Sequence, residues 1–80
     1  MQTVVKGMVQ VAGTTYRIVR IRRGEYNVVR ILDDVPVGAF SNGPTVEITA
    51  HSIDSALMRE IVRVAIQGAK TSWVGRLALG

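Results

Sequence analysis

The sequence predicts an α+β fold. We expect an antiparallel meander of three to four strands, followed by one long amphipathic helix packed on one face and by a short C-terminal tail or strand. Between residues 3 and 50, apolar and polar side chains alternate, and turn residues interrupt them at short intervals. Between residues 53 and 70, apolar residues recur at helical spacing instead. Strands first and one helix after them are typical of a single α+β domain over residues 1–80.

The first strand is predicted over residues 3–11. Val5, Val9 and Val11 are separated by even numbers of positions, so their side chains share one face. The short turn at residues 12–14 predicts antiparallel pairing with the strand that follows.

Residues 14–32, TTYRIVRIRRGEYNVVRIL, are predicted to form the central hairpin, and its register depends on the turn. A two-residue loop would place Arg22 opposite Glu25 and mix both faces. A three-residue loop, with Gly24 at positive φ, would place Arg22 opposite Tyr26 and separate the faces. We prefer the second pairing because one buried face strongly constrains the register of a hairpin.

The preferred pairing divides the hairpin into an aliphatic face and a basic, aromatic face. The aliphatic face is predicted to pack inward and consists of Val19, Ile21, Val29 and Ile31. The opposite face is predicted to stay exposed and consists of Tyr16, Arg20, Arg22, Tyr26 and Arg30. Tyrosine rings can stack on bases, and arginines can hold phosphates, so this face is a candidate binding platform. An ordinary solvated face is the alternative, because Arg and Tyr are common at exposed strand positions.

After the hairpin, residues 33–36 read as a turn and residues 37–40 as a brief extended piece. A loop is predicted over residues 41–44, and a last strand over residues 45–50 with Val46 and Ile48 inward. Ser52 is predicted to cap a helix running from about Ile53 to Lys70.

The apolar arc of that helix is wider than one small sheet is expected to cover. The excess predicts a second contact, made either by the C-terminal tail or by a partner chain, so a homodimer is one of the alternatives. The residues proposed for this interface are Leu57, Met58, Ile61, Val62, Ile66 and Trp73.

Composition limits the functional classes. The formal net charge is +4, which favours nucleic acid or an acidic protein surface as the partner. The chain contains no cysteine, which favours a reducing, cytoplasmic compartment, and no apolar run long enough to span a membrane. One histidine without cysteine cannot form a structural zinc site, and the six acidic residues are scattered, so no metal, cofactor or catalytic centre is expected.

We therefore expect a small non-catalytic binding module. The first hypothesis is nucleic-acid binding through Tyr16, Arg20, Arg22, Tyr26 and Arg30, with Lys6 extending the patch. The alternative is a small phage- or plasmid-type inhibitor that binds a partner protein through the helix and tail.

Overall fold

The computed structural model of the protein describes residues 4–67 and 78–79. Its elements, in chain order, are β1 (Val4–Val5), β2 (Met8–Val11), β3 (Thr14–Arg22), β4 (Glu25–Arg30), β5 (Val35–Asn42), β6 (Val46–Ala50), α1 (Ser55–Ala65), β7 (Ile66–Gln67) and β8 (Ala78–Leu79).

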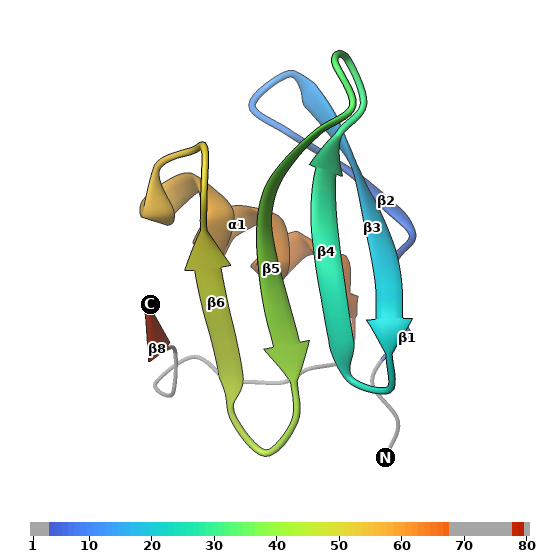
Figure 1. Ribbon diagram of the computed structural model, residues 1–80, viewed down its shortest axis with the longest axis vertical. Helices are drawn as coiled ribbons and strands as arrows, with labels where there is room; N and C mark the ends of the chain where they lie inside the picture. The colour runs from blue at the N-terminus through green and yellow to red at the C-terminus, as the bar shows by residue number, and fades with distance from the viewer. Residues whose placement is uncertain (1–3, 68–77, 80) are drawn as a thin grey trace.

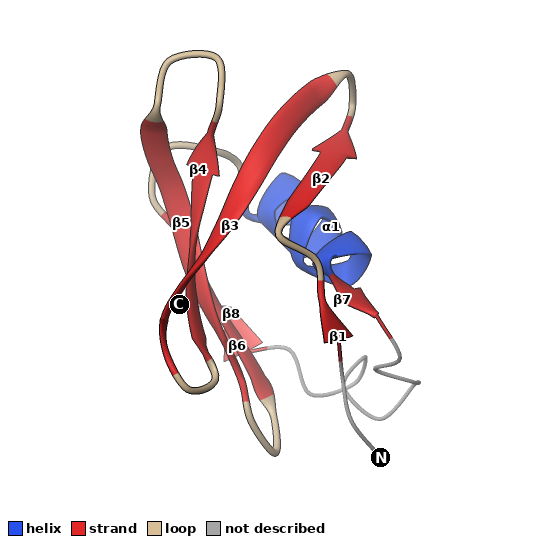
Figure 2. Ribbon diagram, turned by 90° about the vertical axis from the view of Figure 1, so that its right-hand side faces the viewer, coloured by secondary structure: helices blue, strands red, loops and turns tan. Residues whose placement is uncertain are grey.

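Strands β2 to β6 form an antiparallel meander in chain order, and β8 joins the β6 edge in parallel (Figure 1). The helix α1 crosses one face of this sheet and contacts β2, β5 and β6 (Figure 2). The α+β class and the helix packed on one face are therefore confirmed. The meander has five strands, however, and not the three to four predicted from the sequence.

The additional strand is β5, which covers residues that were predicted as a turn, a brief extended piece and a loop. Its residues pair with β4 on one side and with β6 on the other. A register shift between Val28 and Val29 accommodates Pro36, and this irregularity hides the alternation in the sequence. Pairing on both sides stabilises a segment whose local pattern is weak.

The helix has 11 residues and is much shorter than predicted. Asp54, and not Ser52, is its N-cap, because the Asp54 carboxylate accepts a hydrogen bond from the amide of Ala56 at 3.0 Å. At its other end the backbone becomes extended at Ile66, which pairs with Val5 of β1. The chain therefore leaves the helix to form a second, two-stranded sheet, and residues 68–70 of the predicted helix lie outside the described residues.

The core fills the space between α1 and the sheet, and the predicted inward positions Val46 and Ile48 are confirmed as buried. In the central hairpin, however, the predicted assignment of faces is wrong. Val19 and Ile21 are exposed, whereas Tyr16 is 2% exposed and belongs to the core. The core between α1 and the sheet consists of Val9, Tyr16, Ile18, Val28, Val37, Phe40, Val46, Ile48, Met58, Ile61, Val62, Ala65 and Ile66.

The register explains this inversion. Ala12 and Gly13 both have positive φ and form a two-residue turn, which places Val9 opposite Tyr16. On β4, Tyr26 lies opposite Phe40, which in turn lies opposite Ile48. Residues opposite one another share a face, so Tyr16 and Tyr26 lie on the same side as the core positions of the outer strands.

The predicted pairing of Arg22 with Tyr26 is also wrong. Arg20 lies opposite Tyr26, and a register shift then places Arg22 opposite Glu25. This is the two-residue loop, but the shift lets the faces separate anyway.

In the part of the chain that the structure describes, no helix combines the length and hydropathy needed to cross a membrane.

Candidate functional site

The face of the sheet that points away from α1 is the candidate functional site, and we call it the open face. Its side chains form rows across the strands. One row contains Arg22 opposite Glu25, Glu25 opposite Ser41, and Ser41 opposite Glu47. The next row contains Val19, Asn27, Ala39 and Thr49 in the same order of strands. The open face therefore carries mainly polar groups on β4 to β6, whereas β3 contributes both arginines, Arg17 and Arg22, and aliphatic side chains.

Apolar side chains are unusually exposed on the open face. Met8 of β2 is 58% exposed, Ile21 of β3 is 50% exposed, and Val19 lies between them at 39%. Val19 and Ile21 alternate along β3 with the buried Tyr16 and Ile18, so they point to the opposite face, and Met8 lies on that face as well because it is paired with Arg17. Isolated apolar residues are normal on a surface, but neighbours that share one sheet face form a patch of the kind that marks a contact site.

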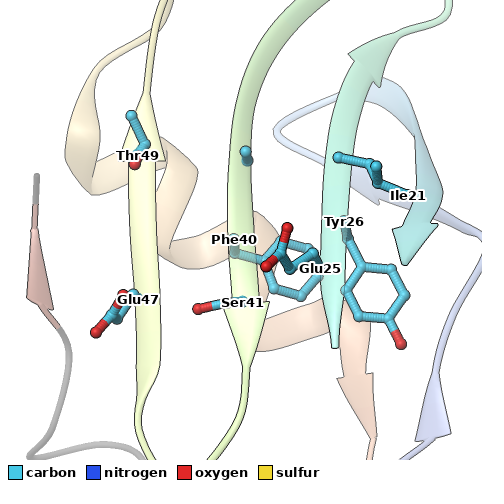
Figure 3. A pocket seen from close by; sticks show the side chains of 8 residues that line it. Ile21, Glu25, Tyr26, Phe40, Ser41, Glu47 and Thr49 are labelled. Atoms are coloured by element: carbon cyan, nitrogen blue, oxygen red, sulfur yellow. The ribbon is translucent and has the colours of Figure 1, made fainter. Parts of the chain in front are cut away.

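A shallow depression of about 250 Å³ lies beside this patch (Figure 3). Ala39 and Ser41 contribute small side chains, while Glu25, Glu47 and Thr49 contribute polar ones. Ile21, Tyr26 and Phe40 complete the lining. The depression therefore combines an aliphatic border with carboxylates and hydroxyls from three neighbouring strands.

Most charged groups of the described residues are already paired. Arg17 contacts Asp34 at 3.2 Å and Arg22 contacts Glu25 at 3.5 Å. The exception among the six acids is Glu47, which has neither an ion pair nor a hydrogen bond to a described residue. Glu47 is exposed and lies on the open face.

Two further ion pairs shift the pKa values of their members. Arg30 donates two hydrogen bonds of 2.9 Å to Asp33, and this lowers the pKa of the Asp33 carboxyl from its ordinary 3.8. Arg63 likewise donates to Glu60 on the outer side of α1 and lowers the pKa of that carboxyl. These arginines are engaged within the chain, so less of their charge is available to a ligand.

The six residues predicted to bind nucleic acid do not form one exposed plane. Tyr16 is buried, and Tyr26 is half-buried with its ring stacked on Phe40 at a centroid distance of 5.0 Å. The cross-strand pairs Tyr16–Arg30 and Arg20–Tyr26 do share a face, but it is the face that α1 packs on. Arg22 lies beyond the register shift, and the exposed members are Lys6, Arg20 and Arg22.

The residues predicted for a helix-mediated interface lie mostly inside the protein. Met58, Ile61, Val62 and Ile66 are at most 4% exposed and pack in the chain's own core. These helix residues are therefore not available as a surface for a partner chain. Leu57 is half-buried, and Trp73 lies outside the described residues.

Sequence reasoning missed the open face because it placed Val19 and Ile21 in the core. One signal could have revealed their position. The two-residue turn at Ala12 and Gly13 sets Tyr16 opposite Val9 and so on the inner side. Because side chains alternate along β3, Val19, three positions after Tyr16, then points to the outer side.

Within residues 4–67 and 78–79, no group of three or more His, Cys, Asp or Glu side chains is placed to hold a metal ion. Comparison of the chain with protein-family models, with curated proteins and with solved structures gave no match.

Proposed function

We propose that this chain is a non-catalytic protein-binding module and that its docking surface is the open face of the sheet. The observation that carries the proposal is the exposure of Met8, Val19 and Ile21 together on one side of β2 and β3. Burying such side chains stabilises a complex by roughly 25 cal/mol for each Å² of apolar area removed from water. The rim of paired charges and hydroxyls around them resembles the polar rim of protein interfaces.

The binding mode differs from the helix-and-tail surface expected from the sequence, because the helix residues lie in the core. A rigid sheet face suits a binding module, since few side chains need to be ordered on association. A small inhibitor that covers a partner's functional surface is one kind of protein that fits this description.

The test compares the proteins that an immobilised chain retains from a cell extract. We expect Ile21→Asp to lose specific partners that the wild-type chain retains. The matched control is Leu32→Asp, because Leu32 is 88% exposed but lies in the turn between β4 and β5. If both variants retain the same partners as the wild type, the open face is not the docking surface.

Nucleic-acid binding is the second candidate, and a different observation favours it. Lys6, Arg20 and Arg23 are exposed and have no ion pair with a described residue, on a chain whose formal net charge is +4. Arg20 also lies opposite Tyr26, so a base could stack beside a phosphate contact. The supporting surface then lies around the C-terminal end of β3, near Arg20 and Arg23, and not on the plane expected from the sequence.

Salt-dependent titration with single-stranded DNA and RNA oligomers tests this candidate. Removing two phosphate contacts with Arg20→Ala and Arg23→Ala should reduce the log–log salt slope by roughly 1.4 to 1.8. The control is Arg17→Ala with Arg63→Ala, because both arginines are already paired with carboxylates. Absence of binding at low salt, or an equal loss of slope in both double variants, would rule the candidate out.

A further inference from the structure

We infer that the occupant of the open face is a second copy of this chain, related to the first by a two-fold axis that runs parallel to the strands over β4. The inference rests on the proposed function, since it names the partner of the same surface. In a closed dimer of this kind, each protomer contributes the same patch, and every contact occurs twice.

The area of the face is sufficient for such a dimer. The five antiparallel strands are four to nine residues long. At ~3.3 Å per residue and ~4.8 Å between strands, they cover a flat footprint of roughly 500 Å². Two such footprints total roughly 1,000 Å², which matches the lower limit expected of a biological interface and fits a dimer of modest affinity. Two sheets packed face to face with nearly aligned strands also form a common arrangement.

The shape of the face is complementary to itself about this axis. Strand β4 is the middle strand of the antiparallel meander β2-β3-β4-β5-β6, which β8 extends at the β6 edge. Rotation about β4 places β3 of one copy over β5 of the other. Ile21 projects from β3 and is half exposed. Facing it on the second copy are Ala39 and Ser41 of β5, whose small side chains form part of the depression. Each copy therefore supplies an apolar knob and a matching hollow.

The charges are complementary about the same axis. Arg22 and Glu47 lie in one row of the open face but on opposite sides of β4. The rotation brings β6 of one copy over β2 of the other, one strand away from β3, so Glu47 lies on the Arg22 side of its partner. Glu47 is the carboxylate that has neither an ion pair nor a hydrogen bond among the described residues. Arg22 is 72% exposed and makes only a long contact of 3.5 Å with Glu25. A two-fold axis perpendicular to the strands would instead stack β6 on β6 and leave Glu47 unpaired.

Sedimentation equilibrium of the full chain tests the inference. A dimer with a Kd of about 10 µM would be nearly complete at about 0.5 mM, and its mass would be twice 8.7 kDa. We expect Ile21→Asp to remain monomeric and Leu32→Asp to associate like the wild type. Circular dichroism of both variants verifies that the fold is retained.

A charge-exchange experiment tests the axis. Glu47→Arg places two arginines together in its homodimer, and Arg22→Glu places two carboxylates together, so each variant alone should associate at least about tenfold more weakly. In an equimolar mixture, both contacts of the heterodimer regain opposite charges, and association should return toward the wild-type level.

A wild-type chain that stays monomeric at about 0.5 mM overturns the inference, and so does a dimer that tolerates Ile21→Asp. Association that is weakened in both charge variants but not restored in their mixture overturns the axis. The proposed function fails separately: it survives a monomeric result if Ile21→Asp abolishes retention of another protein, and it fails if the wild-type chain is monomeric and retention is also unchanged.

Discussion

Gly38 of β5 lies directly against Met58 of α1, closer than any other residue type would permit. A Cβ atom at position 38 would lie 2.7 Å from Met58 Sδ and 2.5 Å from the carbonyl oxygen of Thr49. Met58 is fully buried, so it has little space into which to retreat. The missing side chain of Gly38 thus sets how closely the helix approaches the sheet.

We therefore predict that Gly38→Ala destabilises the fold by about 1 to 3 kcal/mol, because it overpacks the helix–sheet contact. Urea denaturation measures the change. Gly7→Ala is the matched control, since no atom outside the neighbouring residues lies within 4 Å of a Cβ there. Equal stability of the two variants would contradict the tight contact.

Truncation of two adjacent residues of β3 should reduce the stability of the fold to very different extents. Ile18 is 7% exposed in the core, whereas Val19 is 39% exposed on the open face. We predict that Ile18→Ala costs about 2 to 5 kcal/mol of unfolding free energy and Val19→Ala less than about 1 kcal/mol. Thermal or urea unfolding at low protein concentration measures both without a contribution from self-association. A larger effect at Val19 would restore the face assignment expected from the sequence.

The start of the helix provides a third test. Asp54 accepts a hydrogen bond from the amide of Ala56, while Ser52 lies outside the cap. Asp54→Ala should therefore reduce stability by roughly 1 kcal/mol, and Ser52→Ala should leave it nearly unchanged. If Ser52→Ala has the larger effect on the unfolding midpoint, the helix begins where the sequence alone placed it.

The ion pair between Arg30 and Asp33 predicts a pH dependence of stability. The pKa of Asp33 is lowered in the folded chain because its carboxylate accepts hydrogen bonds from Arg30. The folded state then binds a proton less readily than the unfolded state. Its stabilising contribution is therefore present above the ordinary pKa of 3.8 and is lost as the pH falls through the lowered value.

We expect Asp33→Asn to be less stable than the wild type at pH 7, and the two to converge in strong acid. Carbon-detected NMR titration of the carboxyl gives a direct check, because Arg30→Met should return the Asp33 pKa toward its ordinary value. An unchanged pKa in Arg30→Met would show that Arg30 is not the cause of the shift.

Sequence reasoning succeeded where local pattern and tertiary environment agree. Val46 and Ile48 alternate with polar neighbours on an outer strand, and both are buried as predicted. It failed at β5, where Pro36 and the shift in register interrupt the alternation, and at Ile66, where pairing with Val5 ends the helix early. These outcomes depend on partners distant in the sequence, which no local pattern contains.

The amino-acid order by itself determined the α+β class, the central hairpin, and the grouping of its side chains into two alternating sets as far as Arg20, because strand geometry sends every second residue to the same side. It did not determine which set is buried, because Ile18 with Val28 and Val19 with Ile21 are both apolar enough to enter a core. Only the tertiary structure decided this. The turn at Gly13 ties Tyr16 to Val9, and α1 packs on the face that Val9 and Ile48 share, so the second aliphatic set is left at the surface.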